Sequence, residues 1–294
     1  MTKEEINKNL HDGTSAKAPA VKRSESTQYG KYGVDSDRFN PGALAQSDHA
    51  KSCLSLPKLD PNNIPSHVAI IADGNRRWAK RNLLNIAAGH RAGADTATNL
   101  VIDAKKIGIK TVTIFVFSTE NWKRSEWEIS TLIHLLDEML KKELPNMKKE
   151  GVAFHTIGEL SRFPASLQET IRQTKEETKE GKEIDFILAL NYGGRDELTR
   201  AMSKIVDGVL AGRIDKNGLT EQLIQEHLDT ASFKDPELII RTSGEMRTSN
   251  FLLWQNCYSE FVLIDKFWPE FTREDLIESV RIYQGRDRRK GGGS

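Results

Sequence analysis

The chain has 294 residues and a formal net charge of +1, with 43 lysines and arginines against 42 aspartates and glutamates. This length allows one large α/β domain or two smaller ones, and the balanced charge favours neither nucleic acid nor a membrane surface as a partner. The two cysteines, Cys53 and Cys257, have no metal-ligand spacing and suit a reducing compartment. No stretch approaches the roughly 18 apolar residues of a membrane span.

Residues 1–60 differ in composition from the rest. Their apolar residues follow no period, and their charges nearly cancel. We expect a disordered or loosely ordered N-terminal extension, without the apolar region of a secretory signal. The segment STQYGKYGVDSDRF (26–39) leaves a docking role open.

From residue 61 to 294 apolar runs alternate with helical patterns. Strands are predicted at 68–72, 111–117, 152–157, 185–190, 237–241 and 260–264. Helices are predicted at about 90–107, 126–142, 165–180, 195–211, 219–229 and 272–283, the clearest being 126–142. This order predicts a single α/β domain with a mostly parallel central sheet flanked by helices.

Polar loops follow four of these strands, at the sheet edge where α/β proteins bind ligands. They read DGNRRW (73–78), STENWKR (118–124), NYGGR (191–195) and RTSGEMRTSN (241–250). The grouping at one edge predicts a functional site there.

Asp73 directly follows a strand predicted to be buried on both faces. It has three ordinary interpretations: a helix cap, an ion pair with an arginine, or a metal ligand. Gly74 permits close backbone approach, and Asn75, Arg76 and Arg77 supply donors for phosphate. A carboxylate beside such donors makes sense if Mg²⁺ bridges it to a phosphate.

The loop 241–250 offers a second anion cradle through Arg241, Arg247 and Ser249, and Glu260 is a candidate second carboxylate. Two such cradles suggest an enzyme with two phosphorylated substrates. Neither GxxxxGK[ST] nor GxGxxG is present, which disfavours the common nucleotide folds. Asn75 stands where aspartyl phosphatases carry a second aspartate, so covalent phosphoryl chemistry is also disfavoured.

Seven stretches, in order, resemble the cis-prenyltransferases, close to undecaprenyl diphosphate synthase. They are HVAIIADGNRRWAK (67–80), GHRAGA (89–94), FSTENWKR (117–124), NYGGRDEL (191–198), IIRTSGEMRTSNFLLWQ (239–255), WPEF (268–271) and RRKGG (288–292). The resemblance covers residues 65–292. The DDxxD motif of all-trans prenyltransferases is absent, since no two aspartates are adjacent.

This resemblance implies that isopentenyl diphosphate adds repeatedly to an allylic diphosphate such as farnesyl diphosphate, each new double bond being Z. The product is a polyprenyl diphosphate of the undecaprenyl class, a lipid carrier precursor for cell-wall glycan, held in an apolar tunnel. Mg²⁺ is the implied cofactor. A homodimer is implied, located in the cytoplasm and touching the inner face of the membrane transiently, with no role for nucleic acid.

The resemblance also assigns residues. Asp73 is the catalytic carboxylate and, with Glu260 across a dimer interface, a metal ligand. Asn121 takes the proton-acceptor position, although a neutral amide suits positioning or relay better. The allylic substrate is held by Gly74, Asn75, Arg76, Arg77, Trp78 and His90, with further contacts from Ser118, Thr119, Glu120, Trp122 and Arg124. Isopentenyl diphosphate is held by Arg241, Arg247, Thr248 and Ser249, and Arg289 with Gly291 forms a C-terminal phosphate motif.

Three positions depart from the family pattern. Ala72 replaces a common methionine, and Arg76 replaces a glycine common in bacterial members. Ile86 stands where an arginine usually grips the allylic diphosphate, so one phosphate contact is either missing or supplied by a neighbour such as Arg81 or Arg91. Val116, where makers of long chains often carry alanine, is a candidate tunnel wall residue.

Two alternatives stay open. The chain resembles the catalytic type more than the non-catalytic subunit of a two-chain prenyltransferase, because Asp73, Asn121, Arg241 and Arg247 are all present. A phosphate-binding module without turnover is the third hypothesis.

Overall fold

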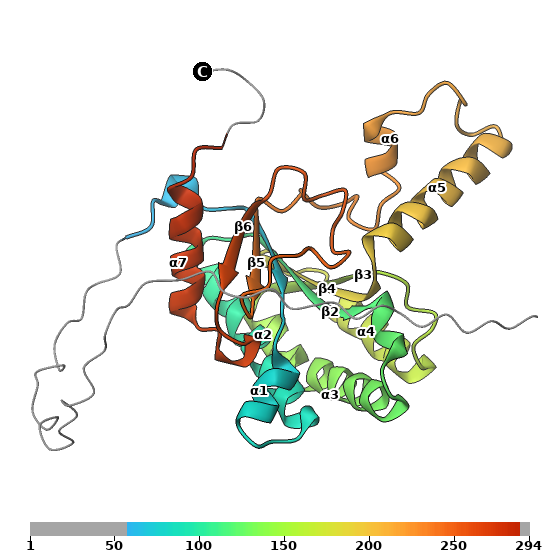
Figure 1. Cartoon of the computed structure of the whole chain (residues 1–294). Coiled ribbons are helices and arrows are strands. Elements are labelled where there is room, and N and C mark those ends of the chain that lie inside the picture. The colour runs from blue at the N-terminus through green and yellow to red at the C-terminus, as the bar shows by residue number, and fades with distance from the viewer. Residues whose placement is uncertain (1–57, 289–294) are drawn as a thin grey trace, which may run out of the picture. The chain divides into compact units, whose positions relative to one another are not determined.

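The computed structural model describes residues 58–288 (Figure 1). The expectations for most of residues 1–60 and for Arg289 and Gly291 lie outside this range. The six strands are β1 (His67–Ile71), β2 (Thr111–Ser118), β3 (Val152–Ile157), β4 (Ile184–Tyr192), β5 (Leu238–Thr242) and β6 (Glu260–Ile264). All six predicted strands are confirmed, with ends shifted by at most two residues.

The strands form one sheet in the order β3-β4-β2-β1-β5-β6, and every neighbouring pair is parallel. β1 lies between β2 and β5, so Ile70 pairs in register with Ile114 on one side and Ile240 on the other. The chain builds outward from β1 through β2 and then crosses back to β5. This reversal creates a topological switch point beside β1, where ligands bind in open α/β sheets.

The helices are α1 (Asn75–Arg81), α2 (Ile86–Ile107), α3 (Glu126–Glu150), α4 (Ala165–Thr178), α5 (Gly194–Leu210), α6 (Glu221–Gln225) and α7 (Arg273–Gln284). Short 3-10 turns lie at Pro61–Asn63, Thr119–Lys123 and Trp268–Glu270. Among the described residues no helix is long and apolar enough to cross a bilayer.

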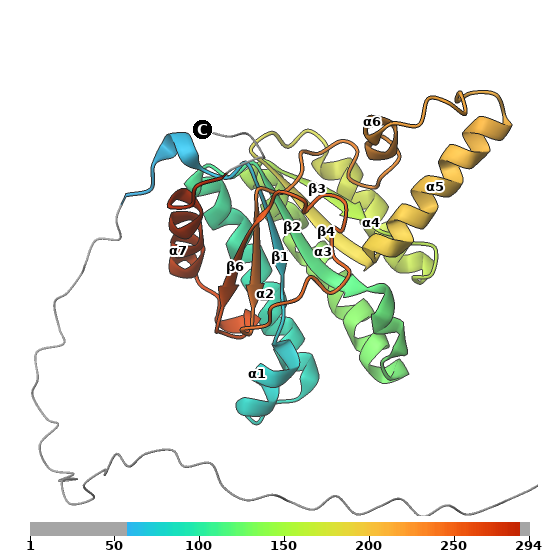
Figure 2. The same ribbon diagram turned by 45° about the horizontal axis from the view of Figure 1, so that its top comes forward.

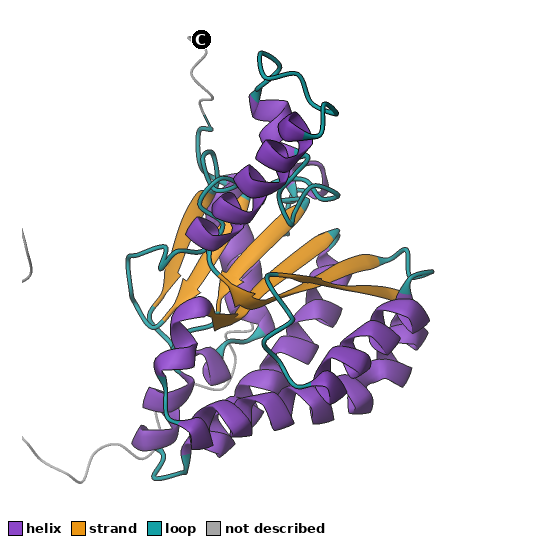
Figure 3. Ribbon diagram, turned by 90° about the vertical axis from the view of Figure 1, so that its right-hand side faces the viewer, coloured by secondary structure: helices purple, strands orange, loops and turns teal. Residues whose placement is uncertain are grey.

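The two faces of the sheet are covered differently. Val68 and Ile70 of β1 belong to the larger apolar cluster, which includes side chains of α2, α3, α4 and α7. Ala69 and Ile71 point to the opposite face, where Phe251 from the loop after β5 packs in a smaller cluster. Figures 2 and 3 show α2, α3 and α4 together on one side of the sheet, whereas α5 extends away from it.

Two predicted helices have the wrong length. α3 continues past the predicted end at 142 and through Pro145 to Glu150, because Met147 is buried beyond the proline and Gly151 closes the helix with φ 68°. Tertiary packing therefore outweighs the local effect of proline. The segment predicted as a helix at 219–229 contains only the five residues of α6.

Candidate active site

Asp73 follows β1, and its backbone carbonyl accepts three hydrogen bonds. The donors are the Thr242 hydroxyl at 2.7 Å, the Ser243 hydroxyl at 3.0 Å and the Trp268 backbone N–H at 2.9 Å. The end of β5 and the turn after β6 therefore hold the turn after β1 in one position, as expected for segments that meet at the switch point.

The Asp73 carboxylate lies between two guanidinium groups. Arg77 donates to Oδ1 at 3.0 Å, and Arg241 donates to Oδ2 at 2.9 Å. Partial burial alone would raise the pKa of Asp73, but the hydrogen bonds from Arg241 and Arg77 outweigh it and lower the pKa. Of the three interpretations of Asp73, the ion pair is confirmed, and the carboxylate is ionised at neutral pH.

Gly74 is required by its surroundings. Its φ is 108°, and a Cβ would lie 2.4 Å from the Ser243 hydroxyl and 2.8 Å from the Phe267 ring. Both the backbone angle and the space exclude other residues. Because Gly74 has no side chain, the backbone can pass close to Ser243 and Phe267, and α1 begins at the next residue.

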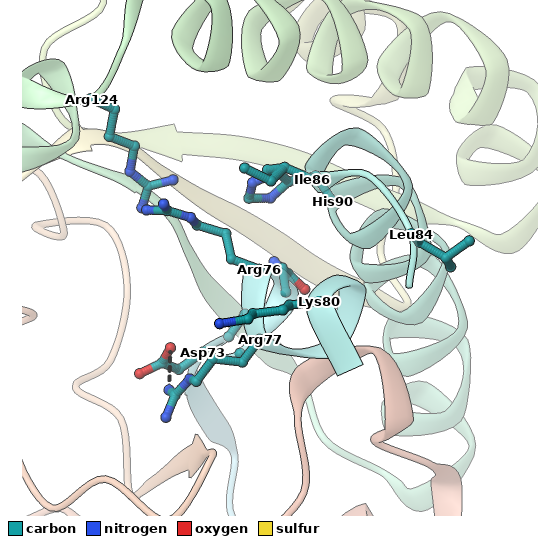
Figure 4. A pocket seen from close by; sticks show the side chains of 11 residues that line it. Asp73, Arg76, Arg77, Lys80, Leu84, Ile86, His90 and Arg124 are labelled. Atoms are coloured by element: carbon teal, nitrogen blue, oxygen red, sulfur yellow. Dashed lines mark hydrogen bonds and ion pairs between the residues drawn. The ribbon is translucent and has the colours of Figure 1, made fainter. Parts of the chain in front are cut away.

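A cavity of about 680 Å³ opens beside Asp73, between α1 and the start of α2 (Figure 4). Its lining includes four basic side chains, of Arg76, Arg77, Lys80 and Arg124, together with apolar ones. Its lining residues are Ala72, Asp73, Gly74, Asn75, Arg76, Arg77, Lys80, Leu84, Ile86, His90 and Arg124. We call it the first pocket; its charge suits an anion such as a diphosphate.

Glu128 at the start of α3 organises part of this pocket. Its buried carboxylate accepts a hydrogen bond from Arg124 at 2.9 Å, and it lies 3.8 Å from both Arg76 and His90. Burial, aided by the nearby Arg124 charge, lowers the pKa of His90 to about 4, so this ring is neutral at pH 7. Sequence reasoning missed Glu128, although its position four residues after Arg124 on a predicted helix was an available signal.

A second pocket of about 490 Å³ lies on the other side of Asp73. It is formed by the carboxyl ends of β1 and β2 and by the loop after β5. Its lining residues are Ile71, Ala72, Asp73, Phe115, Val116, Ser118, Glu120, Asn121, Arg124, Ser249 and Asn250. The two pockets share Ala72, Asp73 and Arg124, so the carboxylate stands at their junction.

The Asn121 amide has a structural task in this pocket. Its Oδ1 accepts the Ser118 backbone N–H at 3.1 Å and closes the turn after β2. Asn250, which sequence reasoning missed, donates to Glu120 at 3.1 Å and accepts from the Arg195 backbone N–H at 3.0 Å. Asn250 thus joins three of the four predicted loops, and only the NYGGR loop contributes no lining residue.

The loop after β5 is built around Arg241. This buried guanidinium donates to Ser249 Oγ at 2.8 Å and to the Arg247 carbonyl, while also binding Asp73. The Arg247 side chain is exposed and pairs with Glu245, which also accepts from Arg77 at 3.1 Å. Thr248 contributes its carbonyl to a turn with the Phe251 N–H at 3.1 Å. Of this predicted cradle only Ser249 lines the second pocket directly.

Several predicted site residues lie elsewhere. Trp122 packs edge-on against Phe117 and donates to Asn191 at 2.8 Å, so it supports the loop and lines neither pocket. Trp78 on α1 and Thr119 after β2 also line neither pocket.

Glu260 lies far from the junction for a topological reason. It is the first residue of β6 and pairs with Leu238, the first residue of β5, whereas Asp73 follows the last residue of β1. Because the strands are parallel, Glu260 lies at their amino ends and Asp73 lies beyond their carboxyl ends, on the opposite side of the sheet. The Glu260 carboxylate accepts instead from Arg286 at 2.6 Å, so one chain does not bring the two predicted metal ligands together.

Neither residue expected to replace the missing arginine at Ile86 faces the first pocket. Arg81 pairs with Glu270 and stacks over the Phe267 ring at 4.9 Å. Arg91 donates to Glu138 on α3 at 3.2 Å. Of the two alternatives, the structure favours a missing arginine contact, because Arg81 and Arg91 both point to other elements.

An apolar cavity of about 130 Å³ lies behind the first pocket, between α2, β2 and α3. It shares Ala72, Asn75, His90 and Arg124 with that pocket and is otherwise mainly hydrophobic. Its other lining residues are Gly93, Ala94, Ala97, Ile114, Phe115, Val116, Leu132, Leu135, Leu136, Met139, Leu188 and Trp268. Val116 is a wall residue, as predicted.

Within residues 58–288 no cluster of three His, Cys, Asp or Glu side chains forms a metal site. Mg²⁺ is often held by one or two carboxylates, waters and substrate phosphates. An ionised Asp73 at the junction of the two pockets fits that mode, with the remaining ligands supplied by substrate.

Residues 71–291 match the family model described as "Putative undecaprenyl diphosphate synthase". The chain belongs to this cis-prenyltransferase family. It is 46% identical to an isoprenyl transferase of Clostridium perfringens over 79% of this chain and 91% of the relative, and 45% identical to one of Staphylococcus saprophyticus over 80% and 92%. The activity is therefore transfer of isoprenyl groups, which disfavours the non-catalytic alternatives.

The fold comparison agrees. A crystal structure of lavandulyl diphosphate synthase from Lavandula x intermedia in complex with dimethylallyl diphosphate matches with a TM-score of 0.77 and 34% identity, over 79% of this chain and all of that one. The six-stranded parallel sheet flanked by helices is thus the fold of the family.

Proposed function

We propose that this cis-prenyltransferase condenses isopentenyl diphosphate with an allylic diphosphate, such as farnesyl diphosphate, to make a Z-polyprenyl diphosphate of the undecaprenyl class. The observation that carries the proposal is the arrangement of two polar pockets that meet at Asp73, with an apolar cavity behind the first. An allylic diphosphate has the same two parts, an anion and a hydrocarbon tail.

In this arrangement Asn75, Arg76, Arg77 and Arg124 hold the allylic diphosphate in the first pocket, and its tail enters the apolar cavity past His90. Isopentenyl diphosphate occupies the second pocket, with its anion toward Ser249 and the loop of Arg241 and Arg247. The two pockets share a wall, so the reacting carbons can meet beside Asp73.

The reaction breaks the allylic C–O bond and releases diphosphate. The terminal alkene carbon of isopentenyl diphosphate bonds to the allylic carbon, and one proton leaves the neighbouring methylene. Basic side chains stabilise the charge that develops on the departing diphosphate. Asn121 is fixed by its hydrogen bond to Ser118, which suits positioning of the alkene and the proton's route to a diphosphate oxygen.

Mg²⁺ is the proposed cofactor, with Asp73 as its protein ligand. A bound Mg²⁺ would neutralise diphosphate oxygens and improve the leaving group. Glu260 is proposed to contribute from a second copy, since it does not reach Asp73 within one chain.

We further propose that residues 61–294 form the catalytic domain of a homodimer in the cytoplasm. An exposed stripe of Met202, Val206 and Leu210 on α5 supports such an interface, because its four-residue spacing places the three side chains on one helix face. Release of a long hydrocarbon product would need peripheral contact with the inner face of the membrane.

The direct test incubates the full chain with labelled isopentenyl diphosphate, farnesyl diphosphate, Mg²⁺ and detergent, and separates the dephosphorylated products by thin-layer chromatography. The proposal expects primer-dependent polyprenyl products with Z double bonds. A folded sample that binds both substrates but forms no product would instead support a phosphate-binding module or a subunit that needs a catalytic partner.

A further inference from the structure

Lys80 is a basic residue of the first pocket to which neither the motifs nor the comparisons assign a role. It lies in the last turn of α1, four residues after Arg76, and its side chain lines the cavity. Residues at this spacing share one helix face. In Figure 4 the Lys80 side chain lies between that of Arg76, which extends toward Arg124, and that of Arg77, which lies beside Asp73.

The other permanent cations of this pocket already have carboxylate partners. Arg77 donates to Asp73 and Glu245, at 3.0 and 3.1 Å. Arg124 donates to Glu128 at 2.9 Å, and Arg76 lies 3.8 Å from the same carboxylate. No carboxylate in the described part of the chain pairs with Lys80, so its charge is free to meet a ligand.

The facing helix contributes no charge. α2 presents Ile86 and, one turn later, His90 to the pocket. Ile86 is apolar, and the buried imidazole is neutral at pH 7. The cations that line this pocket therefore come from α1 and from Arg124, which precedes α3.

We propose that Lys80 binds the diphosphate of the allylic substrate and supplies the positive charge that α2 lacks at Ile86. This inference rests on the proposed function of the pocket. A lysine ammonium binds phosphate as a single point charge, unlike the two-pronged arginine fork. The contact should thus raise affinity for the allylic diphosphate while placing few demands on its orientation.

The test replaces Lys80 by methionine, which keeps much of the aliphatic stem and removes the charge. K80M should raise KM for farnesyl diphosphate by about 5- to 30-fold, the range of a lost charged hydrogen bond at a partly solvated site, and leave KM for isopentenyl diphosphate within about twofold. Lys149, exposed in the last turn of α3, provides the control: K149M should change neither KM.

A second variant separates binding from a structural effect. In the K80M background, Ile86→Arg should return KM for farnesyl diphosphate toward the wild-type value, because it restores a cation on the opposite wall of the same cavity. A purely structural role of Lys80 would not be rescued from α2. An unchanged KM in K80M, an equal rise for both substrates, or failure of Ile86→Arg to rescue would each overturn the proposal.

Calorimetric binding of farnesyl diphosphate without isopentenyl diphosphate distinguishes this inference from the proposed function. A wild-type protein that elongates the primer, with K80M binding it equally well, would contradict only the role of Lys80. A wild-type protein that binds the primer but does not elongate it would contradict the function. In that case weaker binding of farnesyl diphosphate by K80M would still support the proposed contact of Lys80 with the diphosphate. Equal binding would refute that contact.

Discussion

At the scale of residues, two arginines from different elements bind the Asp73 carboxylate. Arg77 lies one helical turn later on α1, and Arg241 lies at the end of β5. In the absence of substrate these cations keep the carboxylate ionised and in place. Of these two arginines only Arg77 lines the first pocket, whereas Arg241 is buried behind the second.

We predict that Asp73→Ala reduces kcat by at least about 100-fold, because it removes the charge that orients the arginines and the proposed Mg²⁺. Asp95→Ala, an exposed position on α2, is the matched control and should be neutral. Thermal unfolding checks that the variant is folded. Retention of more than about a tenth of kcat, a barrier change of only ~1.4 kcal/mol, would contradict the assignment.

The two arginines of the loop after β5 should behave differently. Arg247 is exposed and contacts a single carboxylate, so Arg247→Ala should raise KM for isopentenyl diphosphate about 10-fold or more, with a smaller effect on the primer. Arg241 is buried among Asp73, Ser249 and a carbonyl, so Arg241→Ala should also lower kcat and the melting temperature.

Steady-state kinetics with each substrate varied in turn, plus calorimetry, measures this contrast. Arg213→Ala, an exposed arginine after α5, is the control. Equal changes in both KM values for Arg247→Ala would count against two separate anion sites.

His67 gives the fold a pH dependence outside the active site. Burial lowers its pKa to about 4, and the ring is bound by the Lys234 carbonyl and the Thr113 hydroxyl. In the unfolded chain His67 therefore binds a proton near pH 6.5, whereas in the folded chain it binds one only near pH 4. Stability is full above that window and falls as the pH drops through it, by up to roughly 3 kcal/mol from this residue.

Denaturant unfolding between pH 7 and pH 4 measures this slope. His67→Gln should flatten it even if overall stability is lower, whereas His134→Gln, at an exposed position on α3, should leave the wild-type slope. An unchanged slope in His67→Gln would assign the acid sensitivity to other groups such as His90.

At the scale of elements, α2, β2 and α3 enclose the cavity that would receive the hydrocarbon chain. Its volume of about 130 Å³ is small beside the roughly 300–1,000 Å³ of ordinary ligand sites. A long product therefore requires α2 and α3 to separate, or side chains in the walls to move.

Val116 stands where β2 passes from the second pocket to this cavity, and its side chain is 38% exposed. Val116→Ala widens the passage, so we expect longer products with KM for the primer unchanged. Val209→Ala on α5 makes the same change in side-chain volume at a residue that lines neither pocket nor the cavity, and is the control. Thin-layer chromatography measures the length of the products. Shorter products from Val116→Ala would contradict the role of Val116 as a wall residue of the cavity.

At the scale of the whole molecule, the proposed dimer depends on surface that one chain leaves uncovered. Met202, Val206 and Leu210 are 41%, 51% and 81% exposed along one face of α5. Among the aromatic residues of 249–271, Phe251 and Trp268 are buried core, whereas Tyr258 is 73% exposed.

We expect the mass of a dimer by light scattering at micromolar concentration. Val206→Glu should shift the population toward monomer, because a charge in an apolar interface is costly. Lys204→Glu, on another face of α5, is the control. A wild-type monomer would contradict the proposed dimer and, with it, a metal contact by Glu260 from a second copy.

The sequence by itself determined the six strands, their parallel arrangement and the four loops that gather at one edge. Strand periodicity and loop chemistry are local signals, and the topology of a parallel sheet places carboxyl ends together. Asp73, Asn75, Arg76, Arg77 and Ser249 could be selected this way, whereas His90, Asn121 and Arg124 were implied by the family resemblance. The structure brings all eight to the two adjoining pockets.

Only the tertiary structure decided which side chains face the pockets and which do not. Glu128 belongs to no motif, and the motifs that contain Lys80 and Asn250 gave these two residues no role. Their positions depend on how α3, α1 and the loop after β5 pack. Trp122 lines neither pocket because tertiary packing places its ring against Phe117. Glu260 follows a polar loop in sequence, yet strand pairing puts it at the opposite edge of the sheet, because a parallel strand begins where its neighbour begins.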